Sequence, residues 1–128
     1  MTSPLLSYEY VVLRAVPRVD RDEFINVGVV IHAQRTDFLD CAFNLDAGRL
    51  RSFSRDLDVA SVEKSLKTLG AICRGEQAPG RPTLDGLGPR FGWIAAPRST
   101  VVQPGPIHGG LTGDPAAELQ RLLARLVG

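Results

Sequence analysis

The sequence predicts a single α+β domain in which an antiparallel sheet of three to four strands is covered on one face by two helices. Three observations predict this fold: apolar residues alternate in the first third of the chain, they change to helical spacing near residue 58, and a second amphipathic stretch ends the chain. The chain has 128 residues, of which 44% are hydrophobic and 23% are charged. A chain of this length and composition can bury a core without disulfides or metals.

Residues 8–45 are expected to form a meander of three strands. Residues 8–16 and 24–33 are rich in β-branched and aromatic side chains, and residues 38–45 continue the pattern. The connections between these segments are short and polar. They favour antiparallel pairing, because a parallel pair needs a long crossover.

Alternation with a period of two divides the side chains of these strands between two faces of the sheet. One face is uniformly apolar and is expected to be the core. The other mixes aromatic with polar groups and is expected to be half solvated or to line a site for a ligand or partner. The apolar face collects Val11, Leu13, Ala15, Ile25, Val27, Val29, Ile31, Leu39, Cys41 and Phe43. The mixed face collects Tyr8, Tyr10, Val12, Arg14, Phe24, Asn26, Gly28, Val30, His32, Asp40, Ala42 and Asn44.

The rest of the chain is expected to hold two helices separated by a loop-rich segment. Residues 58–74 have apolar side chains at helical spacing behind an N-cap aspartate, and should lie on the apolar face of the sheet. Residues 75–113 are rich in glycine and proline and are expected to contain one short strand, at 99–103. Residues 114–127 begin with Asp-Pro and have a leucine stripe, which predicts a helix that covers the core or makes an oligomer contact.

Charge and composition argue against several classes of function. The net charge of +1 lacks the basic surplus that phosphate neutralisation needs, so nucleic-acid binding is not expected. The first residues lack the features of a secretory signal, and no apolar run is long enough for a bilayer, so a cytoplasmic protein without membrane contact is expected. Cys41 and Cys73 are expected to be small buried hydrophobes. The sequence predicts no metal site and no cofactor.

The glycine-rich stretch at residues 105–112 comes nearest to a named motif. It has the glycine spacing and final threonine of a phosphate-binding P-loop, but Leu111 stands where that motif requires a lysine. Pro104 and Pro106 also remove backbone donors that a phosphate would need. We therefore interpret the stretch as a loop that uses glycine for its backbone geometry. His108 within it is a weak candidate for a general base, because a base needs a partner that orients it.

Arg14, Asn26 and Asp40 form the most informative polar group, since they stand on the mixed face beside Tyr10. Such groups are costly to bury without partners. One interpretation is an internal network, in which Arg14 pairs with an acid and Asn26 bonds to the backbone of a loop. The other is a polar surface for a partner's carboxylate or a ligand's phosphate, which arginine suits.

Three stretches of the chain carry a family resemblance: Tyr10–Pro17 with Asp22–Val30, then Ala96–Pro106, then Gly110–Val127. Together they resemble the bacterial family known as domain of unknown function 3037. The positions that match its signatures are Arg14, Glu23, Asn26, Gly28, Arg98 and the pair Gly105-Pro106. Members of that family are often encoded beside a kinase-like protein similar to the HipA toxin kinases. The resemblance therefore implies an accessory role beside such a partner, and it implies no defined site.

Two functions are expected from these observations. The leading one is a non-enzymatic accessory or interaction protein, with a contact surface that includes the mixed face at Arg14, Asn26, Tyr10 and Glu23. The alternative is a small enzyme, or a protein that binds an anion or nucleotide, in which the polar sheet face and the glycine-rich stretch form one pocket around Arg14, Asn26, Arg98 and His108. Self-association is compatible with either.

Overall fold

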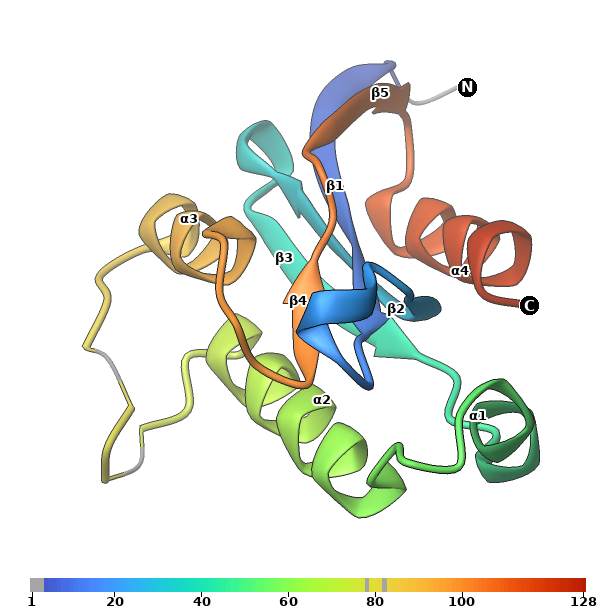
Figure 1. Ribbon diagram of the computed structural model, residues 1–128. Helices are drawn as coiled ribbons and strands as arrows, with labels where there is room; N and C mark the ends of the chain where they lie inside the picture. The colour runs from blue at the N-terminus through green and yellow to red at the C-terminus, as the bar shows by residue number, and fades with distance from the viewer. Residues whose placement is uncertain (1–3, 78, 82) are drawn as a thin grey trace.

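The computed structural model describes residues 4–77, 79–81 and 83–128, and within them it has a five-stranded antiparallel sheet with helices on both faces (Figure 1). The strands are β1 (Leu6–Ala15), β2 (Ile25–Ala33), β3 (Phe38–Phe43), β4 (Val102–Pro104) and β5 (His108–Thr112). The α-helices are α1 (Ala47–Phe53), α2 (Val59–Cys73), α3 (Leu87–Ala95) and α4 (Pro115–Leu126), and two 3-10 turns are η1 (Val19–Arg21) and η2 (Gln34–Thr36). The α+β class and the antiparallel sheet are confirmed, and the sheet is larger than the three to four strands expected.

The predicted meander forms the centre of this sheet. Strand β2 pairs antiparallel with β1 on one side and with β3 on the other. Strands β4 and β5 both pair with the free side of β1, β4 opposite Leu13–Ala15 and β5 opposite Leu6–Tyr10. The glycine-rich stretch that we expected to be a loop is therefore largely an edge strand.

The link between β4 and β5 is a bulge in the sheet edge. Pro104 lies opposite Leu13 and His108 lies opposite Tyr10, so three edge residues span two residues of β1. The amide of Gly105 donates to the carbonyl of Val12 at 2.8 Å. Pro106 can occupy the bulge because proline has no N–H to contribute to the ladder.

A second bulge, in β2, changes which side chains share a face. Leu13 pairs with Gly28 and Arg14 pairs with Asn26, so Val27 is an extra residue in β2. Beyond Val27 the side chains of β2 alternate between the two faces of the sheet in the opposite phase, because one inserted residue exchanges the faces. Val27 lies on the predicted core face, but Val29 and Ile31 lie on the opposite face, so their assignment was wrong.

The two faces consequently have two separate cores. Helices α2 and α3 cover one face, and their core includes Val11, Leu13, Val27, Val30, Leu66 and Ile94. Helix α4 covers the other, with a core of Tyr8, Val29, Ile31, Ala33, Leu119, Leu122 and Val127. The prediction that the helices lie on one face was wrong, because the β2 bulge supplies the second face with apolar side chains. The mixed face is thus largely beneath α4 (Figure 1).

The two predicted helices form with the expected caps. The carboxylate of Asp58 accepts the amide of Ser61 at 3.2 Å, and that of Asp114 accepts the amide of Ala117 at 3.1 Å. Helices α1 and α3 were not expected, since they are short and α3 contains glycine and proline. They form because each buries apolar side chains, such as Leu50 and Phe91, against the α2 side of the sheet.

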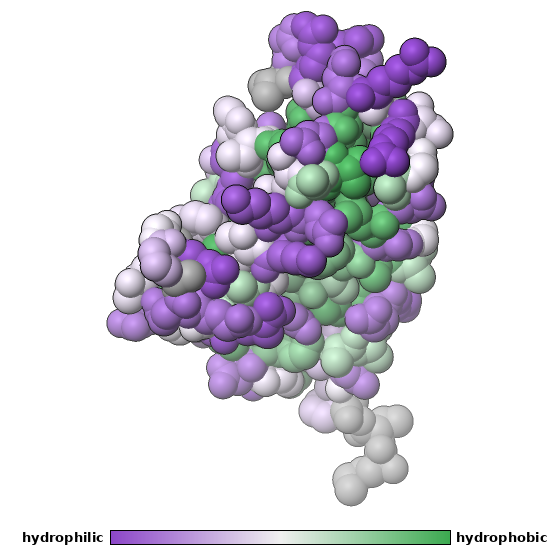
Figure 2. Space-filling view, turned by 90° about the horizontal axis from the view of Figure 1, so that it is seen from below, coloured by the Kyte–Doolittle hydropathy of each residue, from purple (hydrophilic) through white to green (hydrophobic). Residues whose placement is uncertain are grey.

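The lower side of the molecule, where α1 and α2 lie, has a band of apolar surface bordered by polar residues (Figure 2). In the part of the chain that the structure describes, every helix is too short or too polar to cross a bilayer.

Candidate functional site

Arg14 lines a small pocket where the end of β1 meets β4 and the segment before β2. The pocket has a volume of about 150 Å³ and is lined by Arg14, Val16, Asp22, Glu23, Phe24, Gln103 and Pro104. The guanidinium of Arg14 lies 3.9 Å from the centre of the Phe24 ring, and its Nε is buried without a hydrogen-bond partner. Gly105 permits this packing, since a Cβ there would come 3.1 Å from the guanidinium carbon. Arg14 is held by packing against a ring and a glycine.

Carboxylates lie in the same pocket. Glu23 is half exposed and forms an ion pair with Arg21 at 3.2 Å. Asp22 adopts a left-handed conformation with φ of 59°, which turns the chain from η1 into the segment before β2. A pocket with one guanidinium and two carboxylates suits a group that carries both polarities more than a simple anion.

Asn26 has an internal role at the C-terminal end of α4. Its side-chain amide donates to the carbonyl of Leu126 at 3.1 Å, and Asn44 donates in the same way to the carbonyl of Gly128 at 2.5 Å. These carbonyls lie at a helix end, where they have no partner within the helix. Asn26 and Asn44 therefore attach the end of α4 to the sheet.

Tyr10 and His108 are neighbours across β1 and β5. Their rings are stacked with centres 5.2 Å apart, Tyr10 partly buried and His108 exposed. Among the contacts of the described residues, no hydrogen bond to the His108 ring is present. The structure thus offers His108 no carboxylate to orient it, as a general base would need.

Arg98 lies against α2 and α3, on the other side of the sheet from α4. Its guanidinium stacks over Trp93 at 4.3 Å and donates to carbonyls at the end of α3, including that of Ile94 at 3.3 Å. Burial lowers the pKa of Arg98. Its pocket and the Arg14 pocket share no lining residue. The structure does not bring Arg14, Asn26, Arg98 and His108 into one pocket.

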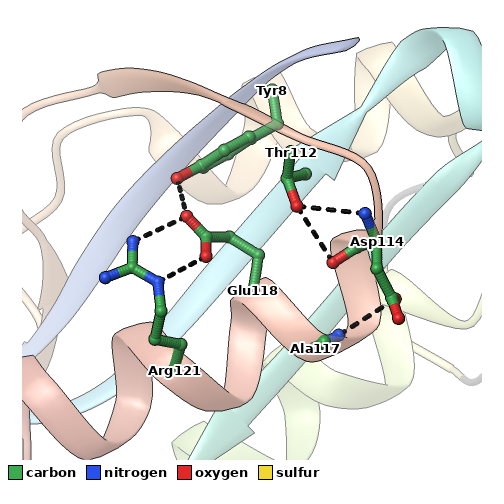
Figure 3. Close-up of polar contacts among 6 residues, drawn as sticks. All are labelled: Tyr8, Thr112, Asp114, Ala117, Glu118 and Arg121. Carbon is green, nitrogen blue, oxygen red and sulfur yellow. Dashed lines mark hydrogen bonds and ion pairs between the residues drawn. The ribbon is translucent and has the colours of Figure 1, made fainter. Parts of the chain in front are cut away.

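A polar cluster that the sequence did not reveal joins β1 to α4 (Figure 3). The hydroxyl of Tyr8 donates to the carboxylate of Glu118, which also accepts two hydrogen bonds from Arg121, at 2.6 and 2.7 Å. The Glu118 side chain is only 10% exposed. Thr112 and Asp114 exchange hydrogen bonds next to it and lead the chain from β5 into α4. The spacing of Glu118 and Arg121 was visible in the sequence, but no local pattern links them to Tyr8.

The ionisation of this cluster reflects its contacts. Hydrogen bonds from Arg121, and then from Tyr8, lower the pKa of Glu118 to about 2. Burial, followed by the neighbouring carboxylate, raises the pKa of Tyr8 to about 12. Tyr8 stays neutral and Glu118 stays charged at neutral pH, so neither is poised to exchange a proton. The cluster is better suited to holding α4 than to catalysis.

The remaining titratable candidates are buried or partly buried. His32, which alternation placed on the mixed face, is 6% exposed and stacks on Phe91 of α3 at 5.2 Å. Burial raises the pKa values of Cys41 and Cys73, the latter to about 12, which keeps both thiols protonated. Within the described residues no three His, Cys, Asp or Glu side chains are grouped as metal ligands would be.

Exposed apolar side chains lie along the edge of the sheet formed by β1 and β5. Leu5 is 66% exposed, Ile107 54% and Leu111 62%. Leu111 lies opposite Ser7, and the next pair along the strands is Tyr8 with Gly110. Because the Tyr8 side chain lies on the α4 face, Leu111 lies on the face away from α4. Strand β5 pairs with β1 on one edge, and its other edge has no partner strand among the described residues.

This arrangement defines a small α+β protein with a two-sided sheet and an open edge strand, without a cluster of catalytic groups in the described residues. The chain belongs to the family described as protein of unknown function DUF3037, whose model matches residues 10–127. The resemblance inferred from the sequence is thereby confirmed. No curated protein and no solved structure matches the chain significantly.

Proposed function

We propose that this chain is a non-enzymatic accessory protein that binds an extended segment of a partner protein along β5. The observation that supports the proposal is the open outer edge of β5 beside the exposed side chains of Ile107 and Leu111. An edge strand offers a row of unpaired amides and carbonyls, and a partner strand can pair with them.

Edges that should stay unpaired are usually blocked by charge, proline or a bulge. The neighbouring part of this edge is blocked in that way, by Pro104, Pro106 and the bulge around Gly105. Strand β5 itself, His-Gly-Gly-Leu-Thr, has no acidic residue, lysine, arginine or proline. The open part of the edge is therefore confined to five residues, enough for a short strand.

Exposed apolar surface supports the same location. Leu5, Ile107 and Leu111 are three of the five exposed large hydrophobic residues in the described chain. Burying one such side chain in a partner contributes about 1.5–3 kcal/mol, so this group can anchor a partner whose backbone pairs with β5. The candidate partner is a kinase-like protein similar to the HipA toxin kinases, as the family resemblance implies.

The test is binding of the purified kinase-like neighbour to wild-type protein, to Leu111→Arg and to the control Phe53→Arg. Phe53 is also an exposed apolar residue, but it lies on α1, far from β5 (Figure 1). We expect Leu111→Arg to weaken binding by at least about tenfold and Phe53→Arg by less than about twofold. Equal affinities for the three proteins would contradict the proposal. A wild-type dimer that Leu111→Arg dissociates would show instead that β5 pairs with a second copy.

A second candidate function is small-ligand binding at Arg14, which the unpaired buried Nε of this residue supports. The ligand would combine an acceptor for Arg14 with a donor for Glu23, as a zwitterion does. The edge strand remains the stronger basis for a function, because the Arg14 pocket holds only about 150 Å³.

A further inference from the structure

The structure contains a second pocket, separate from β5 and from Arg14, whose chemistry points to a ligand. It lies between α2, the end of α3 and the segment that leads into β4, and has a volume of about 210 Å³. Its lining residues are Lys64, Ser65, Thr68, Leu69, Trp93, Arg98, Thr100 and Val102. None of these is acidic.

The charges of the two cations in the pocket are not neutralised by an ion pair within the described residues. Neither Lys64 nor Arg98 takes part in an ion pair among the described residues, whereas Lys67, one turn further along α2, pairs with Glu63 at 2.9 Å. Three carbonyls near the end of α3 accept from Nε and one terminal nitrogen of Arg98. Its other terminal nitrogen makes no hydrogen bond to a described residue. An unpaired guanidinium that is partly removed from water is stabilised by an anion beside it.

The rest of the pocket is largely apolar, with three hydroxyl side chains, Ser65, Thr68 and Thr100, among its walls. Leu69 and Val102 are buried core residues that reach the pocket wall, and the Trp93 indole lies beneath the Arg98 guanidinium. The hydroxyls of Thr68 and Thr100 already donate to the carbonyls of Lys64 and Val102, at 3.0 and 2.7 Å. These threonines therefore present methyl groups and acceptors, so the pocket has a cationic rim above an apolar interior.

We propose that this pocket binds a small organic anion, with its carboxylate or phosphate at Lys64 and Arg98 and an apolar body against Leu69, Val102 and Trp93. The volume admits a body about the size of one aromatic ring beside the charged group. Guanidinium and ammonium donors suit both kinds of anion, and the walls favour a ligand that is not purely ionic.

Trp93 makes the test direct, because it is the single tryptophan of the chain and lines the pocket. Its fluorescence is titrated with phenyl phosphate and benzoate as full probes, with inorganic phosphate as the anion alone and with benzyl alcohol as the apolar body alone. We expect at least one full probe to bind about tenfold more tightly than either part. The stronger of the two full probes identifies the anion.

The matched variants are Lys64→Gln and Lys67→Gln, which remove the same charge from the same helix. Lys64 lines the pocket and is exposed, so its replacement should not affect folding, and Lys67 lies outside the pocket. Lys64→Gln should weaken binding of the full probe about five- to tenfold, and Lys67→Gln by less than about twofold. The proposal is overturned if neither full probe changes the fluorescence, or if both variants weaken binding equally, which would indicate general attraction to α2.

Discussion

At the scale of single residues, one buried carboxylate determines how firmly α4 is held on the sheet. Glu118 receives hydrogen bonds from Tyr8, at the start of β1, and from Arg121, on its own helix. Charge-assisted bonds of this kind are stronger than neutral ones, and they lower the pKa of Glu118 from the usual 4.5 to about 2. Protonating Glu118 would therefore weaken the attachment of α4.

This shift predicts a pH-dependent stability. Because the pKa of Glu118 is lower in the folded than in the unfolded chain, its contribution is complete above about pH 4.5 and is lost as the pH falls toward about 2. Glu118→Gln should lower the free energy of unfolding by about 1–2 kcal/mol at neutral pH, after allowance for solvent screening at Arg121. Its difference from wild type should shrink as acid is added. Urea denaturation across this range measures both effects.

The control is Glu63→Gln, which breaks the exposed ion pair with Lys67 on α2. Exposed pairs contribute little, so this variant should differ from wild type by less than about 0.5 kcal/mol at every pH. A Glu118→Gln difference that stays constant down to acid pH would show that the carboxylate charge is not what holds α4.

At the scale of elements, β5 depends on the absence of a side chain at Gly110. A Cβ there would come 2.5 Å from the Tyr8 hydroxyl, which is fixed by Glu118, whereas a Cβ at Gly109 would meet its nearest atom at 3.6 Å. Gly110→Ala should therefore destabilise the protein by about 1–3 kcal/mol. Gly109→Ala should change stability by less than about 0.5 kcal/mol, since its contact is ordinary. Thermal denaturation of both variants tests this prediction. Equal losses of stability in the two variants would mean that the Tyr8 side chain can move aside.

The same elements show where the sequence was sufficient and where it was not. Strands β1 to β3 and helices α2 and α4 were predicted because their periodicity and caps are local. The bulge at Val27 was not predicted. Gly28 indicates only that another backbone lies close to it, and that backbone, at the carbonyl of Ala42, belongs to another strand. Strand β5 was missed for a similar reason: its glycines accommodate Tyr8, about one hundred residues away.

At the scale of the whole molecule, the candidate site residues were predicted individually but not as a group. Arg14 and Glu23 share a pocket, and Tyr10 and His108 share a stack. Arg98 lies in a separate pocket beside α2 and α3, because the chain passes through α3 before it returns to the sheet as β4. Which residues converge depends on such long-range pairing, and alternation in one strand does not encode it.

The two cores also predict how the molecule unfolds. The α4 core and the α2–α3 core share β1 and β2, so neither can open completely without exposing the other's strands. We therefore expect one cooperative transition, as in most domains of this size. Cys73 reports it from the α2 side, because it is 2% exposed and burial raises its pKa to about 12, which suppresses thiolate chemistry in the folded state.

Thiol labelling of Cys73 in a Cys41→Ala background measures this coupling. Gly110→Ala disturbs only the α4 face. If unfolding is cooperative, and opening and closing are fast relative to labelling, this variant should still speed the labelling of Cys73. The expected increase is about tenfold for each 1.4 kcal/mol of stability that the variant loses. Gly109→Ala in the same background should change the rate by less than about 2.5-fold. A Gly110→Ala rate equal to that of its parent, despite a lower melting temperature, would show that α4 detaches as a separate unit while the α2–α3 side stays closed.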